Sequence, residues 1–572
     1  MRDFRGEWET AAADHGVRGF ENALRRLALL LQRAIGHAPP ADPGIPPTVA
    51  PGHVVVPIWE PELGEQAALL ALELLVAALA PGGSSSAGVR LDAFFARAQA
   101  TNFIEIEMRL IRAAERRGIP WARLVPGRRL VRFGQGAWQA HVHHTFSPAT
   151  GQIATGLATH KDMGAALLRG QGLPVPPNVR VRSSDEAVRA AVAIGLPVVV
   201  KPATTDHGVG VSLGNRDADD VRQAYATAAL HGDVIVESEI AGVNHRLLVM
   251  YGRLVSAVRQ DRAHVVGDGH QTVVALIHGV NADRTDELTS RFRRIEIDDE
   301  ARLLLARQGL TLESVPAAGR TVALRHGSNN SRGGTITNVT PLVHPDNAAV
   351  AVRAAAVVGL DVAGIDFVTT DIARSFREVG GGICEVNPTP GFYMMEPEFR
   401  IEDAFLDGWF PAGERGRVPV VCVVAEDDDV PAPALSAVVT GLQGRVPGLA
   451  VVAPEGVRVD DWWIGRFRHP AREGTRTVLA DPHTRAAVVQ MDLRTIAGHG
   501  LGVDGCALAV VGATPPAAAR PFLDGMRREQ VVAWLAARAG ECVDPADPDR
   551  LTVALDRVVA AALRAVPRGR GV

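Results

Sequence analysis

The feature that most constrains the fold of this 572-residue chain is a regular series of short apolar strands between residues 151 and 405. These strand patterns read "PVVVK", "DVIVES", "HRLLVMYGRLVSAV", "GIDFVTTD" and "ICEVNP", and helical patterns lie between several of them. The alternation predicts an α/β or α+β enzyme core in the middle of the chain.

Lysine usage marks two positions within this core. Of the 60 lysine and arginine residues, only Lys161 and Lys201 are lysines. A lysine is a compact, rotatable point charge and an arginine a planar fork, so the two do not substitute freely at phosphate sites. Lys201 ends an apolar strand and precedes a turn with Gly208 and Gly210, where the missing side chains allow the backbone to approach phosphate oxygens. The pair therefore suggests that the core binds a nucleotide.

Three oxygen-bearing side chains in the same core predict a metal site. Asp366 lies in one strand pattern, and Glu385 and Asn387 lie in another about 20 residues further on. Glu385 and Asn387 are two residues apart, so on a strand both point to the same face. Carboxylate and amide oxygens suit Mg²⁺, which also bridges substrate phosphates. Strand-end charges with no ligand are the alternative, but the combination with the lysines favours ATP and magnesium.

The stretch "DVIVESEIAG" is a strand that continues into an acidic, extended segment. Such a segment is able to offer backbone groups to a purine, and Glu237 or Glu239 to nearby polar atoms. Taken alone, an edge strand with solvated carboxylates explains it equally well.

Composition and charge exclude several function classes. The net charge of −4 argues against a nucleic-acid partner. Cys384, Cys422, Cys506 and Cys542 form no CxxC pair, so neither a zinc site nor a disulfide framework is indicated. The apolar run "QAALLALELLVAALAPGG" contains Glu73 and is too short to cross a bilayer, so it predicts a buried helix. With no signal-peptide pattern at the start, we expect a cytoplasmic protein without a membrane partner.

We expect three domains. Residues 1–150 combine amphipathic helices, a Pro-rich stretch and strands in an α/β domain, and residues 151–410 form the core. After the linker "FPAGERGRVP", residues 416–572 again alternate strands and helices.

With these segments in view, the chain resembles the ATP-grasp superfamily and, within it, the cyanophycin synthetases over almost its whole length. The resemblance rests on "RLVRFGQGAWQ", "THKDMGAALLRGQGLPVP", "PVVVKPATTDHGVGV", "HVVGDGHQTV", "TLESVPAAGRTVALRHGSNNSRGGT", "VVGLDVAGIDFV" and "EVNPTPGF". It implies an α/β multidomain fold: a cyanophycin-synthetase-like N-terminal domain, an ATP-grasp core and a truncated Mur-ligase-like α/β C-terminal domain.

The resemblance also implies roles for individual residues. The implied nucleotide contacts are Lys161 and Lys201 at the phosphates and adenine, the small lid loop with His207, Gly208 and Gly210, and the adenine hinge Glu237, Ser238 and Ile240. Asn244 stands where relatives usually have an acidic residue that holds the ribose. Asp366, Glu385 and Asn387 match the magnesium ligands.

The implied substrate side follows in the same way. Arg246 would steady an acyl phosphate, His264 and Asp268 in the larger lid would lie near the substrate, and Arg325, Asn329, Ser331, Gly333 and Gly334 would line the acyl-acceptor side. The implied reaction makes a peptide bond in two steps: a carboxylate attacks the γ-phosphate of ATP, and an amine attacks the resulting acyl phosphate, with ADP and phosphate as products.

The C-terminal segment departs from full-length cyanophycin synthetases. Their Mur-ligase-like domain has a GxxGK[ST] loop, whereas here the strand "VPVVCV" leads to four acids, Glu426 to Asp429, which would repel a triphosphate. Gln490 stands where relatives have a metal-binding glutamate. The chain also stops about where the last Mur lobe would begin, so we expect residues 416–572 to be catalytically inactive and to support folding or oligomer contacts.

This architecture resembles the short second class of cyanophycin synthetases, which polymerise β-aspartyl-arginine dipeptides. Our first hypothesis is therefore a ligase that joins such dipeptides into cyanophycin or a similar polymer. Gly151, Val209 and the stretch "FYMMEPEF" depart from the family pattern at substrate positions. They favour a second hypothesis, an amide ligase for a different amino-acid or natural-product substrate. The third is a non-catalytic partner of a full-length synthetase. Relatives form dimers and tetramers, so we expect a homo-oligomer.

One histidine cluster stands apart from these segments. His141, His143 and His144 lie in a strand pattern that puts His141 and His143 on one face. A metal site is one reading, but no acidic or cysteine partner lies near in sequence, so we favour a structural or substrate-facing role.

Overall fold

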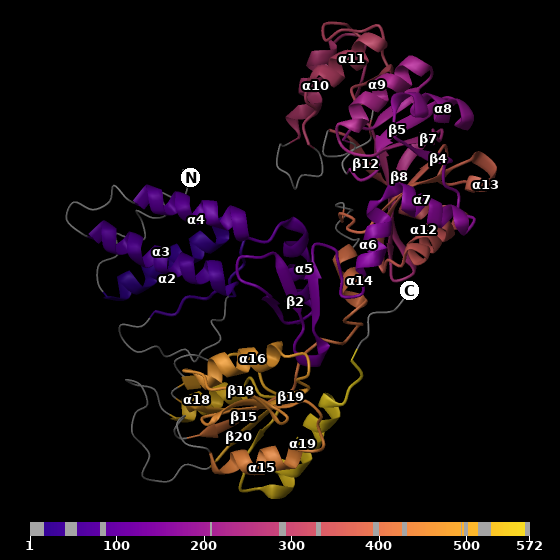
Figure 1. Ribbon diagram of the computed structural model, residues 1–572. Coiled ribbons are helices and arrows are strands. Elements are labelled where there is room, and N and C mark those ends of the chain that lie inside the picture. Colours follow the sequence, from indigo (N-terminus) through magenta and orange to yellow (C-terminus); the bar gives the residue numbers. More distant parts are fainter. Residues whose placement is uncertain are drawn as a thin grey trace. The chain divides into compact units, whose positions relative to one another are not determined.

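The computed structural model describes residues 17–40, 54–79, 87–205, 209–284, 293–325, 327, 333–392, 400–425, 432–493, 495–496, 501–512 and 528–566. The chain divides into two compact units, and the first is assembled from both ends of the sequence. It holds residues 1–141 and 412–567, and the second unit holds residues 142–411 and 568–572 (Figure 1). Both units contain helices and sheets, so the predicted α/β multidomain class is confirmed. The three-domain division stays a prediction.

The first part of unit 1 is helical and ends in a small antiparallel sheet. Its elements are α2 (Val17–Ala34), α3 (Pro61–Leu79), α4 (Ala87–Thr101), α5 (Glu105–Arg116), β1 (Trp121–Arg123), β2 (Leu130–Phe133), the 3₁₀ turn η1 (Gly136–Trp138) and β3 (Ala140–His143), which continues into unit 2. Helix α3 is the apolar run expected to be buried. One face of α3 is buried, with Leu70 and Leu74, whereas Leu69 and Val76 on the other face are exposed. Among the described residues, no helix is both long and apolar enough to span a membrane.

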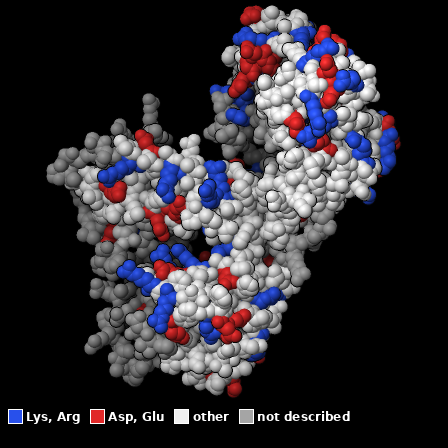
Figure 2. All heavy atoms as spheres, in the orientation of Figure 1, with Lys and Arg blue, Asp and Glu red and all other residues white. Residues whose placement is uncertain are grey.

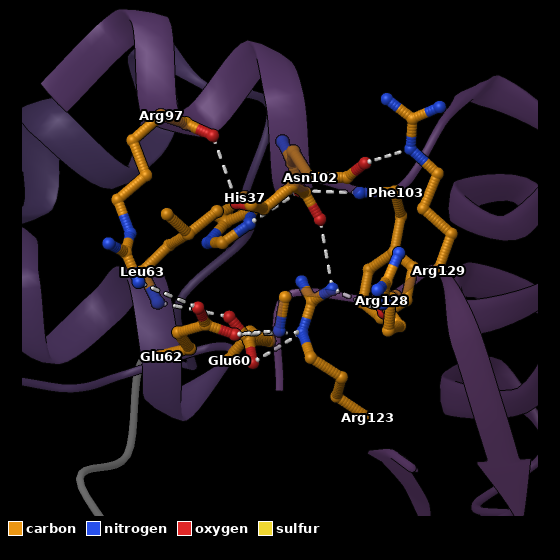
Figure 3. A network of polar contacts seen from close by, with 12 residues as sticks. His37, Glu60, Glu62, Leu63, Arg97, Asn102, Phe103, Arg123, Arg128 and Arg129 are labelled. Atoms are coloured by element: carbon orange, nitrogen blue, oxygen red, sulfur yellow. Dashed lines mark hydrogen bonds and ion pairs between the residues drawn. The ribbon is translucent and has the colours of Figure 1, made fainter. Parts of the chain in front are cut away.

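A buried ion pair joins three elements of this helical part (Figure 3). Arg123 donates from Nε to Glu60 Oε1 at 3.0 Å, and the two side chains are 4 % and 1 % exposed. The Arg123 guanidinium also donates to the carbonyl oxygens of Thr101 and Arg128 and lies 4.1 Å from the centroid of the Phe103 ring. The start of α3, the end of α4 and strand β1 therefore depend on one desolvated cation.

The second part of unit 1 is a sheet of seven strands in the order β18-β17-β16-β19-β15-β20-β21, parallel except that β17 runs antiparallel to both of its neighbours. Its strands are β15 (Val420–Ala425), β16 (Leu449–Ala453), β17 (Gly456–Val459), β18 (Trp462–Gly465), β19 (Ala486–Asp492), β20 (Leu508–Val511) and β21 (Cys542–Val543). Its helices are α15 (Pro433–Leu442), the π-helical turn η4 (Pro470–Gly474), α16 (Thr475–Ala480), α18 (Arg528–Ala536) and α19 (Pro548–Ala562). Apolar clusters cover both faces, as a central parallel sheet requires.

The turn η1 attaches the first part of unit 1 to this sheet. Gly136 has a φ of +53°, and a Cβ there would lie 2.1 Å from the Thr484 carbonyl oxygen. The Ala137 N–H donates to the same oxygen at 2.9 Å, and Trp138 is buried in the sheet's apolar cluster. The segment "GQGAW" is thus a packing contact, which explains why a glycine is needed at its centre.

Unit 2 contains two antiparallel sheets and a two-stranded ribbon, in the orders β4-β7-β5-β6, β12-β9-β8-β13-β14 and β10-β11. The strands are β4 (Asn178–Val181), β5 (Val198–Pro202), β6 (Ser212–Asn215), β7 (Val234–Ser238), β8 (Val243–Met250), β9 (Arg253–Asp261), β10 (His264–Val266), β11 (Thr321–Ala323), β12 (Thr335–Asn338), β13 (Val362–Thr369) and β14 (Gly382–Asn387). The helices are α6 (Gln152–Thr159), α7 (Lys161–Gly170), α8 (Ser184–Ile194), α9 (Ala218–Ala229), α10 (Val273–Ala282), α11 (Asp299–Arg307), the 3₁₀ turn η3 (Thr340–Leu342), α12 (Pro345–Val358), α13 (Phe376–Val379) and α14 (Ile401–Asp407).

Each sheet of unit 2 buries one face under helices. Helices α8 and α9 pack on the four-stranded sheet through Val200 and Val236, and α12 packs on the five-stranded sheet through Leu247, Ile365 and Val386. Side chains alternate along a strand, so the residues beside these apolar positions point away from the helices. On the visible surface, acidic and basic side chains are interspersed (Figure 2).

The Arg123–Glu60 pair gives a stability prediction. Arg123→Met should lower the free energy of unfolding of this part by about 3–5 kcal/mol, because Glu60 is left as an unpaired buried charge. Urea denaturation followed by tryptophan fluorescence would measure the loss, since Trp59 and Trp121 lie next to each other at a ring-centroid distance of 4.7 Å.

The matched control is Arg90→Met, which removes the exposed Arg90–Glu73 pair. It should cost less than about 1 kcal/mol. Equal losses in the two variants would show that burial of the Arg123 pair has no energetic weight.

Candidate active site

A row of charged side chains crosses the five-stranded sheet on the face away from α12. Asp366 on β13 lies directly opposite Arg246 on β8 and directly opposite Glu385 on β14. Directly opposed residues of an antiparallel pair point to the same face. Asn387, two residues beyond Glu385, lies opposite Gly364 and shares that face. The structure thus brings together all three residues predicted to bind magnesium, with Arg246 beside them.

Arg246 holds Asp366 with two hydrogen bonds. Its Nε donates to Asp366 Oδ1 at 2.6 Å and its Nη2 to Oδ2 at 3.1 Å. The Asn387 amide nitrogen donates to the same Oδ2 at 3.3 Å. Paired hydrogen bonds between a guanidinium and a carboxylate are among the stronger polar contacts in proteins. Both oxygens of Asp366 are therefore engaged by groups of the chain itself.

Gly364 makes room for this arrangement. A Cβ at Gly364 would lie 3.0 Å from both Cδ and Nη1 of Arg246 and 2.9 Å from the Pro390 Cβ. Only a residue without a side chain allows the Arg246 stem to cross the strand there. Sequence reasoning missed this residue, although a glycine two positions before Asp366 on the same strand was the available signal.

Lys161 approaches the row from the first residue of α7. Its backbone N–H donates to the Ala203 carbonyl oxygen at 3.1 Å, and its Nζ donates to the carbonyl oxygen of Thr205. The Nζ also lies 3.6 Å from Glu385 Oε1, and the Lys161 side chain is 6 % exposed. Lys161 therefore links Glu385, one of the predicted magnesium ligands, to the segment that follows β5.

The second lysine pairs with the predicted hinge glutamate. Lys201 on β5 donates from Nζ to Glu237 Oε1 on β7 at 2.6 Å, and each side chain is 7 % exposed. Lys201 and Glu237 follow Val200 and Val236, so they point away from α8 and α9. Burial acts to lower the pKa of Lys201, but the Glu237 carboxylate outweighs it, and the pKa lies above its ordinary value.

Electrostatic interactions connect the two sheets at this place. Burial, followed by the nearby Asp366 carboxylate, raises the pKa of Glu385, while Lys161 and Lys201 act in the opposite direction. Burial and then Glu237 raise the pKa of the Cys384 thiol to about 12. Cys384 and Glu385 on β14 thus lie within electrostatic reach of Lys201 on β5, so residues of both sheets form one charged centre.

The charges of this centre balance. Its cations are Lys161, Lys201 and Arg246, and its carboxylates are Glu385, Glu237 and Asp366, each within 4 Å of its partner. Among the described residues, no cluster of three or more histidine, cysteine, aspartate or glutamate side chains forms a metal site by itself. A metal bound by Asp366, Glu385 and Asn387 would accordingly need further oxygen ligands from substrate or water.

Other predicted nucleotide residues are placed as follows. The Ser238 N–H donates to the Pro177 carbonyl oxygen at 2.9 Å, and Ile240 follows β7 and packs near Gly382. Gly210 has a φ of +71°, and a Cβ there would meet Pro202 and His231 at 2.9 Å. Asn244 donates to Gln260 Oε1 at 2.9 Å. His207 and Gly208 lie outside the described residues.

Two predicted substrate-side residues have their contacts in other parts of unit 2. Arg325 is 1 % exposed and donates to Asp298 Oδ1 and the Glu296 carbonyl oxygen, both at 2.9 Å, so its guanidinium supports the start of α11. His264 lies on the β10–β11 ribbon, where its Nδ1 is 2.8 Å from the Arg262 carbonyl oxygen. Asn329 and Ser331 lie outside the described residues, as do Glu426 to Asp429.

The remaining predicted positions have local partners. Gln490 is buried and accepts from the Ala432 N–H at 2.8 Å. His141 Nε2 lies 2.9 Å from Gln139 Oε1, and burial followed by Arg132 lowers the pKa of His141. The structural or substrate-facing role of the histidine cluster stays a prediction.

Comparison with known proteins agrees with this geometry. The family described as "Carbamoyl-phosphate synthase L chain, ATP binding domain" matches residues 161–297, which include both lysines. Cyanophycin synthetase of Nostoc sp. is 33 % identical over 411 residues, covering 70 % of this chain and 45 % of that protein. The chain is similar to the cyanophycin synthetases over most of its length. It carries an ATP-grasp domain, and its predicted resemblance is confirmed.

Two further proteins are similar over shorter stretches. The glutathione biosynthesis bifunctional protein GshAB of Streptococcus mutans is 34 % identical over 236 residues, covering 40 % of this chain and 31 % of that protein. The crystal structure of a bifunctional glutathione synthetase from Pasteurella multocida is 24 % identical, with a TM-score of 0.42, over 62 % of this chain and 52 % of that one. The chain spans about half the length of the cyanophycin synthetases it matches.

Gly364 provides a test of the charged row. Gly364→Ala should lower the free energy of unfolding by about 1–3 kcal/mol, because the added methyl group displaces Arg246 or Pro390. Calorimetric unfolding would record this as a lower transition temperature for unit 2.

Gly391→Ala is the matched control, because a Cβ at Gly391 meets nothing within 4 Å. It should stay within about 0.5 kcal/mol of the unmodified protein. A neutral Gly364→Ala would contradict the steric role assigned to Gly364.

Proposed function

We propose that the chain is an ATP-dependent, ADP-forming carboxylate–amine ligase that makes peptide bonds through an acyl phosphate. The observation that carries this proposal is the charged row of Arg246, Asp366 and Glu385 facing the two lysines of the sequence. Homology to cyanophycin synthetase and GshAB supports it. ATP-grasp ligases use ATP and Mg²⁺, and the site's side chains are suited to both.

The donor atoms fit magnesium. Asp366 and Glu385 contribute carboxylates and Asn387 an amide, and hard oxygen ligands of this kind are those that Mg²⁺ binds. When bound, Mg²⁺ and ATP supply the phosphoryl group and the charge neutralisation for its transfer. With two protein carboxylates, the coordination is left open for phosphate oxygens and water.

The protein's own side chains would then bind and orient the nucleotide and the acyl substrate. Lys161 and Lys201 would contact the phosphates, and Glu237 would keep Lys201 charged and fixed in place. Arg246 lies beside the metal ligands, where its guanidinium stabilises negative charge on the transferred phosphoryl group and on the acyl phosphate. Because these groups lie on two sheets and a helix start, their positions are set by the fold rather than by loops.

The substrate class follows from the rest of the chain. We propose that the acyl donor is a peptide carboxylate and the amine that of a β-aspartyl-arginine dipeptide, joined into cyanophycin or a similar polymer. Residues 416–572 contain no GxxGK[ST] pattern and no lysine, and Gln490 is used to bind the backbone of Ala432. A chain with one ATP site makes one kind of amide bond, and joining preformed dipeptides needs only one.

A second candidate has its own support. Gly151 is the N-cap residue of α6 and has no side chain to cap the helix or to hold a substrate, and Ile153 in the first turn is 82 % exposed. This apolar start is located where the family resemblance implies a serine-containing substrate motif. It favours a ligase for a different amino-acid or natural-product substrate, acting once per product. A cytoplasmic location and a homo-oligomeric state stay predictions.

Product analysis tests the proposal. With ATP and Mg²⁺, β-aspartyl-arginine and a short primer should release ADP and give a mass ladder in dipeptide-sized steps, whereas free aspartate plus arginine should give neither. Glu385→Gln should lower ADP release at least about 100-fold through loss of a metal ligand. Glu378→Gln, in an exposed pair with Arg374, should leave it unchanged.

Each outcome has a distinct meaning. A single adduct instead of a ladder would favour the second candidate. Equal activity of Glu385→Gln and the unmodified protein would refute the ligase proposal.

A further inference from the structure

The charged centre is self-neutralised before any ligand binds. Each of its carboxylates lies within ion-pair distance of a cation of the chain, and each of those cations has a carboxylate. The pairs are largely removed from solvent: the side chains of Arg246 and Asp366 are 14 % and 12 % exposed, and those of Lys161 and Glu385 are 6 % and 25 % exposed. At such sites, removing one partner leaves a poorly solvated charge behind.

Because of this pairing, a divalent cation alone or a nucleoside triphosphate alone would bind unfavourably to the centre. A free divalent cation at Asp366 would have to displace Arg246, which holds both carboxylate oxygens, and would leave the guanidinium beside a second positive charge. The Asn387 side chain also turns its NH₂ group toward Asp366. A free triphosphate would attract Lys161 and Arg246 and leave Glu385 and Asp366 unpaired beside its own negative charge.

Both ligands together restore the balance. The phosphates would form ion pairs with Lys161 and Arg246, and the metal would bind the carboxylates of Glu385 and Asp366. Every charge of the centre would then have a partner. We propose that Arg246 acts as an internal counter-ion that blocks the metal position until nucleotide phosphates draw it away, so that metal and nucleotide bind cooperatively. This inference rests on the proposed function, because it assumes that a nucleoside triphosphate is the ligand of this centre.

The coupling must be reciprocal. If nucleotide raises the affinity for the metal by some factor, the metal raises the affinity for the nucleotide by the same factor. Removing the Arg246 charge should therefore have two linked effects: the metal binds more tightly without nucleotide, and nucleotide affinity depends less on the metal. A residue that only supported the fold would not produce this pair of changes.

Electron paramagnetic resonance with Mn²⁺ as the probe tests the metal side. The signal of free Mn²⁺ gives the bound fraction in the absence of nucleotide. The unmodified protein should bind weakly, and Arg246→Gln should bind Mn²⁺ at least tenfold more tightly. Arg246→Lys, which retains the charge, should bind as weakly as the unmodified protein. Adding Asp366→Asn to Arg246→Gln should abolish the gain, which locates the ion.

Arg259→Gln is the matched control. Arg259 lies on β9 opposite His245, the residue next to Arg246 on β8, and pairs with Asp261, so it belongs to the other face of the same sheet. It should leave Mn²⁺ affinity unchanged. Equal Mn²⁺ affinity of Arg246→Gln and the unmodified protein, or a gain that survives Asp366→Asn, would overturn the inference.

Fluorescent mant-ATP measures the nucleotide side separately. The unmodified protein should bind it at least tenfold more tightly with Mg²⁺ than with EDTA, and Arg246→Gln should reduce that ratio. Binding of mant-ATP that is the same with Mg²⁺ and with EDTA would refute the counter-ion inference alone. Absence of mant-ATP binding under both conditions would refute the proposed function itself.

Discussion

The arrangement of the candidate active site depends on the cross-strand contact between Arg246 and Asp366. Two strands placed side by side in the five-stranded sheet bring together residues that are 120 positions apart in sequence. The same register places Glu385 on the next strand, so that one sheet face carries the Arg246 cation with two carboxylates beside it. The two lysines lie beside this row: Lys161 is at the start of α7, and Lys201 is on a strand of the four-stranded sheet.

The scaffold around the row is built to leave this face polar. The apolar residues that alternate with the charged ones pack against α12 on the opposite face. Gly364 gives the Arg246 stem its path, and the buried Lys201–Glu237 pair fixes the facing sheet. Unit 1 has two contacts of its own: Gly136 packs against Thr484 and so joins the N-terminal part to the C-terminal sheet, and Arg123 forms a second buried ion pair within the N-terminal part.

The sequence was informative where a residue type was rare or its spacing had a geometric meaning. Two lysines among 60 basic residues identified Lys161 and Lys201, and the two-residue spacing of Glu385 and Asn387 placed both on one face. Family resemblance added Arg246, but it did not show that this arginine would hold Asp366, because strand register between distant segments cannot be obtained from local pattern.

Arg325 illustrates the same limit. The resemblance predicts a place for it at the acyl-acceptor side, which stays a prediction, but gives no hint that its guanidinium donates to Asp298 and the Glu296 carbonyl oxygen, because these contacts depend on how α11 packs. Gly364 was missed for a related reason, since the need for a glycine arises from a side chain on another strand.

In the proposed reaction, this centre activates a carboxylate by phosphorylating it. The most direct measurement labels the carboxylate of the acyl substrate with ¹⁸O and determines the isotope content of the released phosphate by mass spectrometry. One ¹⁸O atom should be transferred into each phosphate, because the bridging oxygen of an acyl phosphate comes from the carboxylate. Phosphate without ¹⁸O, released together with amide product, would contradict it.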